Sequence, residues 1–90
     1  MKAATSKTCL NRLHRAEGQI RGIAKMIEEG RYCIEIVTQL QAVKSALQRI
    51  ENEILRDHVS SCVAHAMQSG DTKAQKAKID ELMAVVARAR

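Results

Sequence analysis

The sequence predicts an all-α protein with three helices. Three observations predict this class: the chain has no Pro and four Gly, its apolar residues recur every three or four positions, and nearly all of them are aliphatic. With 90 residues, one Tyr and no Phe or Trp, the chain is expected to form a single domain, residues 1–90, with a thin core. So thin an aliphatic core usually needs a cross-link, such as a disulfide or a bound metal ion, or a partner subunit.

The first helix is expected over residues 6–29. Its apolar stripe consists of Leu10, Leu13, Ala16, Ile20, Ile23 and Ile27. Ser6 or Thr5 is expected to cap the start of the helix, because their hydroxyls accept hydrogen bonds from first-turn N–H groups. Gly30 is expected to end it, since glycine readily adopts the left-handed conformation found just after helices.

The second helix is expected to run without interruption over residues 31–69, which contain no Gly or Pro. Its apolar residues alternate steps of four and three, as in a coiled coil: Ile36, Leu40, Val43, Leu47, Ile50 and Ile54. At ~1.5 Å per residue this helix is nearly 60 Å long, too long for the other two helices to cover. The pattern therefore predicts an antiparallel homodimer, in which the long and first helices of both copies form a four-helix bundle.

The third helix is expected over residues 73–88, after a turn at residues 69–71. Asp71 or Thr72 is expected to cap it, and its apolar stripe starts at Ile79 and includes Leu82.

Cys33, His58 and Cys62 all face one side of the long helix. His58 and Cys62 are four residues apart and so share a face. Cys33 precedes His58 by about seven full turns, which returns it to the same face but places it ~37 Å away along the axis. One chain therefore cannot bring all three to one ion. In an antiparallel dimer centred near residue 46 or 47, Cys33 of one protomer meets the other two residues of its partner, giving two equivalent sites.

Two thiolates and one imidazole favour a soft metal ion. Cu(I) prefers thiolates and accepts three ligands, whereas Zn(II) wants four, and Ni(II) or Co(II) recruit further nitrogen or oxygen donors. The residues alone leave a second interpretation open, because cysteines in a helix seam also pack as small apolar side chains. Cys9 continues the stripe of the first helix and is interpreted as a core residue. His65 is interpreted as a solvated residue rather than a fourth ligand.

The net charge of +5 favours an anionic partner, with nucleic acid as the first candidate. Seven Lys or Arg against three acidic residues within residues 1–31 account for most of this excess. The lack of aromatic side chains disfavours single strands, which are bound by stacking.

Several classes of protein are disfavoured. The longest apolar run, residues 82–87, is too short to span a membrane, and no signal-peptide pattern is visible, so we expect a cytoplasmic protein. We expect no enzymatic activity, because the sequence shows no readable Ser/His/Asp set and no Gly-rich phosphate loop.

The sequence resembles the CsoR/RcnR family, small all-helical bacterial transcriptional repressors that respond to metals or reactive small molecules. The resemblance covers roughly residues 7–87. It rests on NRL at residues 11–13, EGQIRGI at residues 17–23, RYC at residues 31–33 and HVSSC at residues 58–62, in the family's order. It implies a three-helix protomer in an antiparallel dimer, with two dimers usually paired into a tetramer.

The resemblance also implies roles for individual residues. Cys33, His58 and Cys62 match the ligand set of the copper-sensing branch, which implies Cu(I). Tyr32 and Glu81 match positions that surround the family's metal site. Positions implicated in contact with DNA are matched by Arg12 and Arg49, with Arg15, Gln19 and Lys44 as companions.

The resulting hypothesis is a repressor that binds double-stranded operator DNA and releases it when Cu(I) occupies the dimer seam, which derepresses genes for copper export or buffering. One alternative within the family is a sensor of persulfides or other electrophiles at Cys33 and Cys62. A nickel or cobalt sensor is another, although residues 1–8 lack the N-terminal His typical of that branch. An alternative of another class is a structural helical interaction protein.

Overall fold

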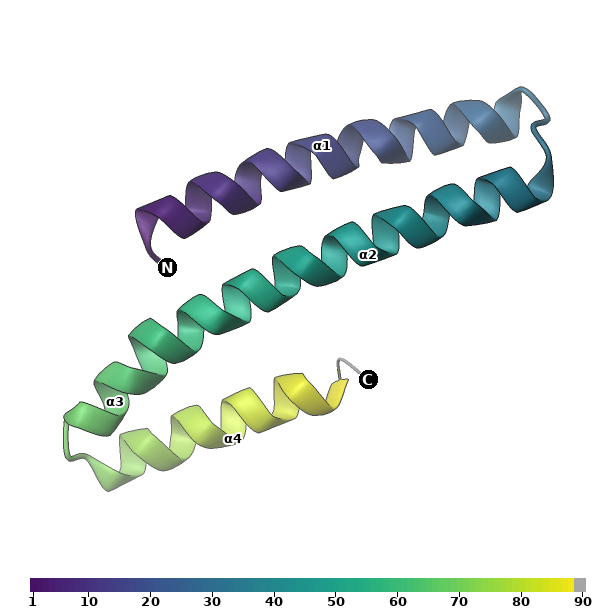
Figure 1. Ribbon diagram of the computed structural model, residues 1–90. Coiled ribbons are helices and arrows are strands. Elements are labelled where there is room, and N and C mark those ends of the chain that lie inside the picture. Colours follow the sequence, from purple (N-terminus) through teal and green to yellow (C-terminus); the bar gives the residue numbers. More distant parts are fainter. Residues whose placement is uncertain (89–90) are drawn as a thin grey trace.

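The computed structural model describes residues 1–88, and this part of the chain is helical without strands. Helices α1 (Ala3–Glu28) and α2 (Cys33–His58) form an antiparallel hairpin. Helix α2 continues through a π turn, η1 (Val59–Val63), into the short α3 (Ala64–Gln68). Helix α4 (Thr72–Arg88) then folds back beside η1 and α3, on the side of the rod away from α1 (Figure 1). The predicted all-α class is confirmed.

The helices lie side by side in one layer. The molecule measures 58 × 27 × 13 Å, and its smallest dimension is close to the diameter of one helix. A single layer offers no second layer against which the helices can bury their apolar faces. None of the helices in residues 1–88 combines the length and the hydrophobicity of a membrane-spanning segment.

The core between α1 and α2 is built from residues one heptad apart. Cys9, Ala16 and Ile23 are buried on α1, and Val43 and Ile50 on α2. The N–H of Lys2 donates to Asp57 at the far end of α2, which fixes the antiparallel register. Because both helices advance by seven residues between buried positions, Cys9 lies level with Ile50, and Ala16 with Val43. The predicted burial of Cys9 is confirmed.

The ends of the helices agree only in part with the sequence patterns. Gly30 has φ +70°, and the N–H groups of Gly30 and Arg31 donate to the carbonyls of Ile27 and Met26, as in a Schellman motif. Asp71 caps α4, because its Oδ1 accepts from the N–H groups of Lys73 and Ala74.

The predicted cap of α1 at Ser6 or Thr5 is wrong. The helix begins at Ala3, and its N-cap residue, Lys2, makes no side-chain capping bond. The first turn instead finds an acceptor on a neighbouring helix.

The predicted uninterrupted second helix is also corrected. Arg31 belongs to the turn that ends α1, so α2 begins only at Cys33. Near the other end, the α-helical pattern is interrupted by the wider turn η1 before α3 resumes it. The rod remains continuous, but its last two turns are rotated relative to an ideal α-helix.

Candidate metal centre and nucleic-acid interface

The three predicted metal ligands lie at the two ends of the rod. Cys33 is the first residue of α2 and is exposed. His58 is the last residue of α2 and is half-buried, and Cys62 is exposed within η1. Within residues 1–88, no three His, Cys, Asp or Glu side chains come together as a metal site would require. A site that uses all three ligands therefore needs a second copy of the chain.

The π turn adjusts the face on which Cys62 lies. Cys33, Leu40, Leu47 and Ile54 follow one another at heptad steps, and a regular helix would place Ser61 next in this row. A π turn holds one residue more than an α turn, so the row continues at Cys62. The hydroxyl of Ser60 donates to the main-chain carbonyl of Asp57 at 3.1 Å, which supplies that carbonyl with a partner inside the widened turn.

Asp57 is a buried carboxylate that the sequence patterns did not single out. It is 5% exposed, and it accepts hydrogen bonds from the N–H of Lys2 at 2.8 Å and from the hydroxyl of Ser61 at 2.9 Å. The hydrogen bond from the Lys2 main chain lowers the pKa of Asp57, and Ser61 acts in the same direction against the opposing effect of burial. The sequence contains one indication of this residue: Asp57 continues the heptad series of Val43 and Ile50, at a position where an apolar residue would be expected.

One broad face of the layer carries a row of exposed apolar side chains, here called the open seam. On α2, Leu40, Leu47 and Ile54 are 46%, 41% and 38% exposed. The α1 residues Leu13, Ile20 and Ile27 are also exposed. Helical rotation in the antiparallel hairpin puts both rows on the same face. The open seam consists of these six residues: Leu13, Ile20, Ile27, Leu40, Leu47 and Ile54.

Tyr32 and Glu81 lie at opposite ends of the rod. Tyr32 is exposed and adjoins Cys33 just before α2. Glu81 lies on α4, which packs against η1, the turn that holds Cys62. Its carboxylate is 3.8 Å from the ammonium of Lys78, so Glu81 makes a local ion pair here. His65 is exposed, in agreement with the expectation of a solvated residue.

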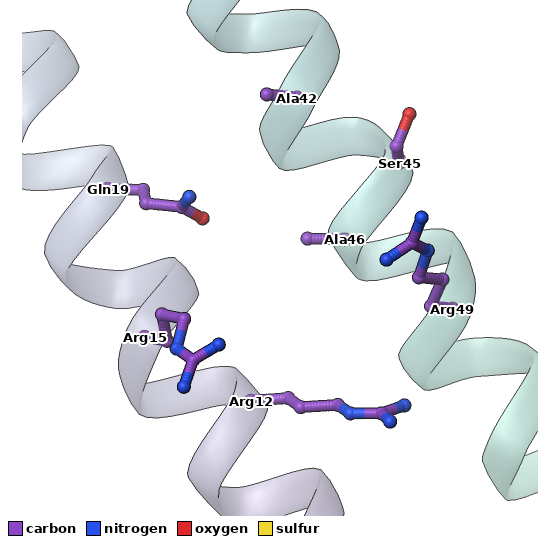
Figure 2. Close-up of a pocket in the computed structure, with 7 residues that line it drawn as sticks. All are labelled: Arg12, Arg15, Gln19, Ala42, Ser45, Ala46 and Arg49. Atoms are coloured by element: carbon purple, nitrogen blue, oxygen red, sulfur yellow. The ribbon is translucent and has the colours of Figure 1, made fainter.

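A hollow of about 500 Å³ lies between α1 and α2 and is lined by Arg12, Arg15, Gln19, Ala42, Ser45, Ala46 and Arg49. Figure 2 shows Arg12 and Arg15 reaching from α1 toward α2, which carries Arg49. No acidic residue lines the hollow, and within residues 1–88 none of these three guanidinium groups forms an ion pair. Four of the five predicted DNA-contacting residues therefore share one site, whereas Lys44 does not line it.

The hollow and the open seam face opposite ways. On α1, Arg12, Arg15 and Gln19 lie on one flank of the buried row, and the exposed leucine and isoleucines lie on the other. On α2, the residues that line the hollow and the residues of the open seam likewise lie on opposite flanks of the buried row, since each residue turns the helix by about 100°. The layer thus has one apolar face and one basic face.

The family of metal-sensitive transcriptional repressors has a sequence model that matches residues 5–88. The chain belongs to this family.

Individual repressors of this family resemble the chain closely. The copper-sensing transcriptional repressor RicR of Mycobacterium tuberculosis is 48% identical over 77 residues, which cover 86% of this chain and 79% of RicR. The copper-sensing transcriptional repressor CsoR of Bacillus subtilis is 49% identical over 61 residues, which cover 68% of this chain and 60% of that protein.

Solved structures of repressors agree with the fold. The crystal structure of the copper-sensing repressor CsoR with Cu(I) from Geobacillus thermodenitrificans has a TM-score of 0.89 at 35% identity, covering 98% of this chain and 88% of that one. The nickel-responsive transcriptional regulator InrS has a TM-score of 0.76 at 38% identity, covering 86% of both chains. Membership in a family of transcriptional repressors agrees with the expectation that this protein is not an enzyme.

Proposed function

We propose that this repressor responds to Cu(I): its metal-free form binds operator DNA in the cytoplasm, and its copper-bound form releases that DNA, so that genes for copper export or buffering are expressed. Family membership gives metal-sensitive repression in general. The choice of Cu(I) is supported by two cysteine thiols and one imidazole as donors, and by relatives that are named copper-sensing repressors.

The observation that carries the proposal is that the centre of the open seam lies at Leu47. Leu40 and Ile54 flank Leu47 at equal distances along α2, so an antiparallel pair of these helices buries the row when its two-fold axis passes close to Leu47. This register pairs residues whose numbers sum to about 94. Cys33 then lies opposite Ser61 and Cys62 of the partner subunit, and Ile36 lies opposite His58 of the partner subunit. The register that buries the apolar row, which contains no ligand, would therefore also bring the donors together.

The donors present fit Cu(I). Both cysteines are exposed in the single chain, and they flank the apolar row rather than packing inside the α1–α2 core, where Cys9 lies. When bound, Cu(I) would supply a link between the first turn of α2 in one protomer and η1 in its partner. The exposure of Cys33 and Cys62 weakens the interpretation that these two residues are only small core side chains.

We assign the surroundings of the site to Tyr32 and Glu81. A ligating histidine commonly donates its second ring N–H to a nearby acceptor, which fixes the ring. Helix α4 packs directly on η1, so Glu81 lies on the helix best placed to offer such an acceptor from within the same chain. Its present partner, Lys78, is a weakly held surface contact at 3.8 Å.

We assign DNA binding to the basic face. Arg12, Arg15 and Arg49 converge on a hollow without acidic residues, which suits the phosphate backbone. In the proposed dimer the apolar faces meet, so the hollow of each protomer stays on the outside. The paired subunits would then present two basic surfaces to a double-stranded operator, and pairing of two dimers would double that number. Lys44 lies outside the hollow, about 160° around α2 from Ala46, and is not part of this assignment.

The proposal is tested by anaerobic titration of the protein with Cu(I), Ni(II), Co(II) and Zn(II) while it is bound to a fluorescent operator. The operator is first selected from random double-stranded DNA with the metal-free protein. Cu(I) should weaken DNA binding by about 5- to 150-fold, the usual range of allosteric coupling. Release by Ni(II) alone would favour a nickel sensor, as the similarity to InrS would allow. Release only by persulfide donors would favour a thiol sensor, and failure to bind any DNA would leave a structural role.

A further inference from the structure

The far end of the α1–α2 core is closed by a charged side chain. Asp57 follows Val43 and Ile50 at heptad spacing and is as buried as they are. Burial of a carboxylate at an otherwise apolar position is costly unless its oxygens are hydrogen-bonded. Asp57 meets this condition with one hydrogen bond on each oxygen, and the two bonds lead to different parts of the chain.

The first bond holds the beginning of α1. Lys2 is the N-cap residue and provides no side-chain cap, so the first-turn N–H groups need acceptors from elsewhere. Oδ2 of Asp57 accepts from the N–H of Lys2 at 2.8 Å. A carboxylate at this point also interacts favourably with the positive end of the helix dipole. A residue of α2 thus performs the capping that the sequence of α1 lacks.

The second bond holds the turn that carries a proposed copper ligand. Oδ1 of Asp57 accepts from the hydroxyl of Ser61 at 2.9 Å, and Ser61 lies in η1 directly before Cys62. Asp57 itself directly precedes His58. Ser60, the neighbour of Ser61, does not bond the carboxylate: its hydroxyl donates to the main-chain carbonyl of Asp57 and lies 3.4 Å from the ammonium of Lys2.

We propose that Asp57 is a positioning residue that transmits the state of η1 to α1, and thereby to the basic face. The proposal rests on the proposed copper response. Helix α1 is a continuous rod, and Arg12 and Arg15 lie roughly 15–20 Å from Lys2 along its axis. If metal binding draws Cys62 toward the partner subunit, Ser61 shifts with it, and the carboxylate can no longer satisfy Ser61 and Lys2 in the same geometry. The cap on α1 then changes, and the arginines move or loosen with the helix.

The test compares two neighbouring serine variants. Ser61→Ala removes the bond between η1 and the carboxylate but keeps the bond to Lys2. Ser60→Ala is the matched control, since it removes a hydroxyl from the same turn without touching the carboxylate. Asp57→Ala, with Asp80→Ala on the exposed face of α4 as its control, removes the carboxylate that caps α1. For each protein we measure Cu(I) affinity, operator affinity without copper, and the ratio of operator affinities without and with Cu(I).

Ser61→Ala should bind Cu(I) and, without metal, operator DNA like the wild type, but the copper-dependent ratio should fall at least fivefold. Ser60→Ala should keep that ratio within twofold. Hydrogen–deuterium exchange on the metal-free proteins gives a readout independent of copper: the first turn of α1 should exchange about fivefold faster in Asp57→Ala than in Asp80→Ala, as loss of a cap predicts.

Two results would overturn the role of Asp57. The first is a wild type that responds to Cu(I) together with a Ser61→Ala protein that responds equally. The second is an unchanged exchange rate at the start of α1 in Asp57→Ala. A wild type that binds DNA but ignores Cu(I) would instead refute the copper response itself, and the exchange experiment would still decide whether Asp57 caps α1. Should Asp57→Ala fail to fold, the serine pair decides the question.

Discussion

Leu47 at the centre of the open seam offers a quantitative test of the dimer. Full burial of a leucine side chain contributes about 1.5–3 kcal/mol. Leu47 is 41% exposed in the single chain, so burial of that remainder in a dimer contributes roughly 1 kcal/mol per copy. Because the two-fold axis passes near Leu47, both copies lose this contribution in Leu47→Ala, which gives about 2 kcal/mol per dimer before any cavity is counted.

The expected result is a dimer dissociation constant about thirtyfold higher, measured by sedimentation equilibrium on the metal-free protein. Ile34→Ala is the matched control, because Ile34 is also an exposed apolar residue of α2 but lies about 140° around the helix from Leu47. It should change the dissociation constant by less than threefold. Equal effects of the two variants, or none from Leu47→Ala, would refute the assignment of this face to the dimer.

Three further predictions concern the sites. Cys62→Ser should abolish copper-induced release of DNA while metal-free DNA binding persists; release that survives would point to other ligands, with His65 the next suspect. His58→Ala should keep tight Cu(I) binding through the two thiolates, but Cu(I) should then weaken DNA binding much less than in the wild type. Glu81→Gln should reduce this effect of Cu(I) on DNA binding more mildly. If His58→Ala loses Cu(I) affinity and the effect on DNA binding equally, His58 is a ligand only. Arg49→Ala should weaken operator binding and lower the slope of its salt dependence by about one for each phosphate group that the protein no longer neutralises. Arg21→Ala should change neither quantity, because Arg21 is already paired with Glu17 at 3.7 Å. A salt slope that Arg49→Ala leaves unchanged would remove the hollow from the DNA interface.

Most of the fold follows from periodicity. The heptad spacing of apolar residues predicted the long rod, and the glycine at position 30 predicted the end of α1, because these features depend on local sequence alone. The predicted length of the long helix implied that one chain could not cover it, and the exposure of Leu40, Leu47 and Ile54 agrees with this.

Features that depend on contacts between distant residues escaped prediction. The cap of α1 comes from Asp57, which is 55 residues away in the sequence from Lys2, and no local pattern reveals such a partner. The π turn likewise escaped prediction, because two adjacent serines in a helix do not by themselves indicate that their hydroxyls bond Asp57 within a widened turn.

The candidate sites were predicted unevenly. Three arginines and Gln19 were assigned to one interface, and the structure gathers them around one hollow, but Lys44 lies elsewhere because its position on α2 is rotated away from α1. The ligand set Cys33, His58 and Cys62 stays a prediction, since the single chain separates its members and only a second copy can bring them together.

Subunit mixing shows whether each copper site is shared between two protomers. Protomers that carry Cys33→Ala are exchanged with protomers that carry His58→Ala and Cys62→Ala, and tightly bound Cu(I) is counted on the purified heterodimer. A shared site predicts one Cu(I) per heterodimer, because the intact Cys33 of one protomer meets the intact His58 and Cys62 of the other, although neither homodimer retains a complete site. A heterodimer that binds no Cu(I) tightly would show that the site is not shared between protomers.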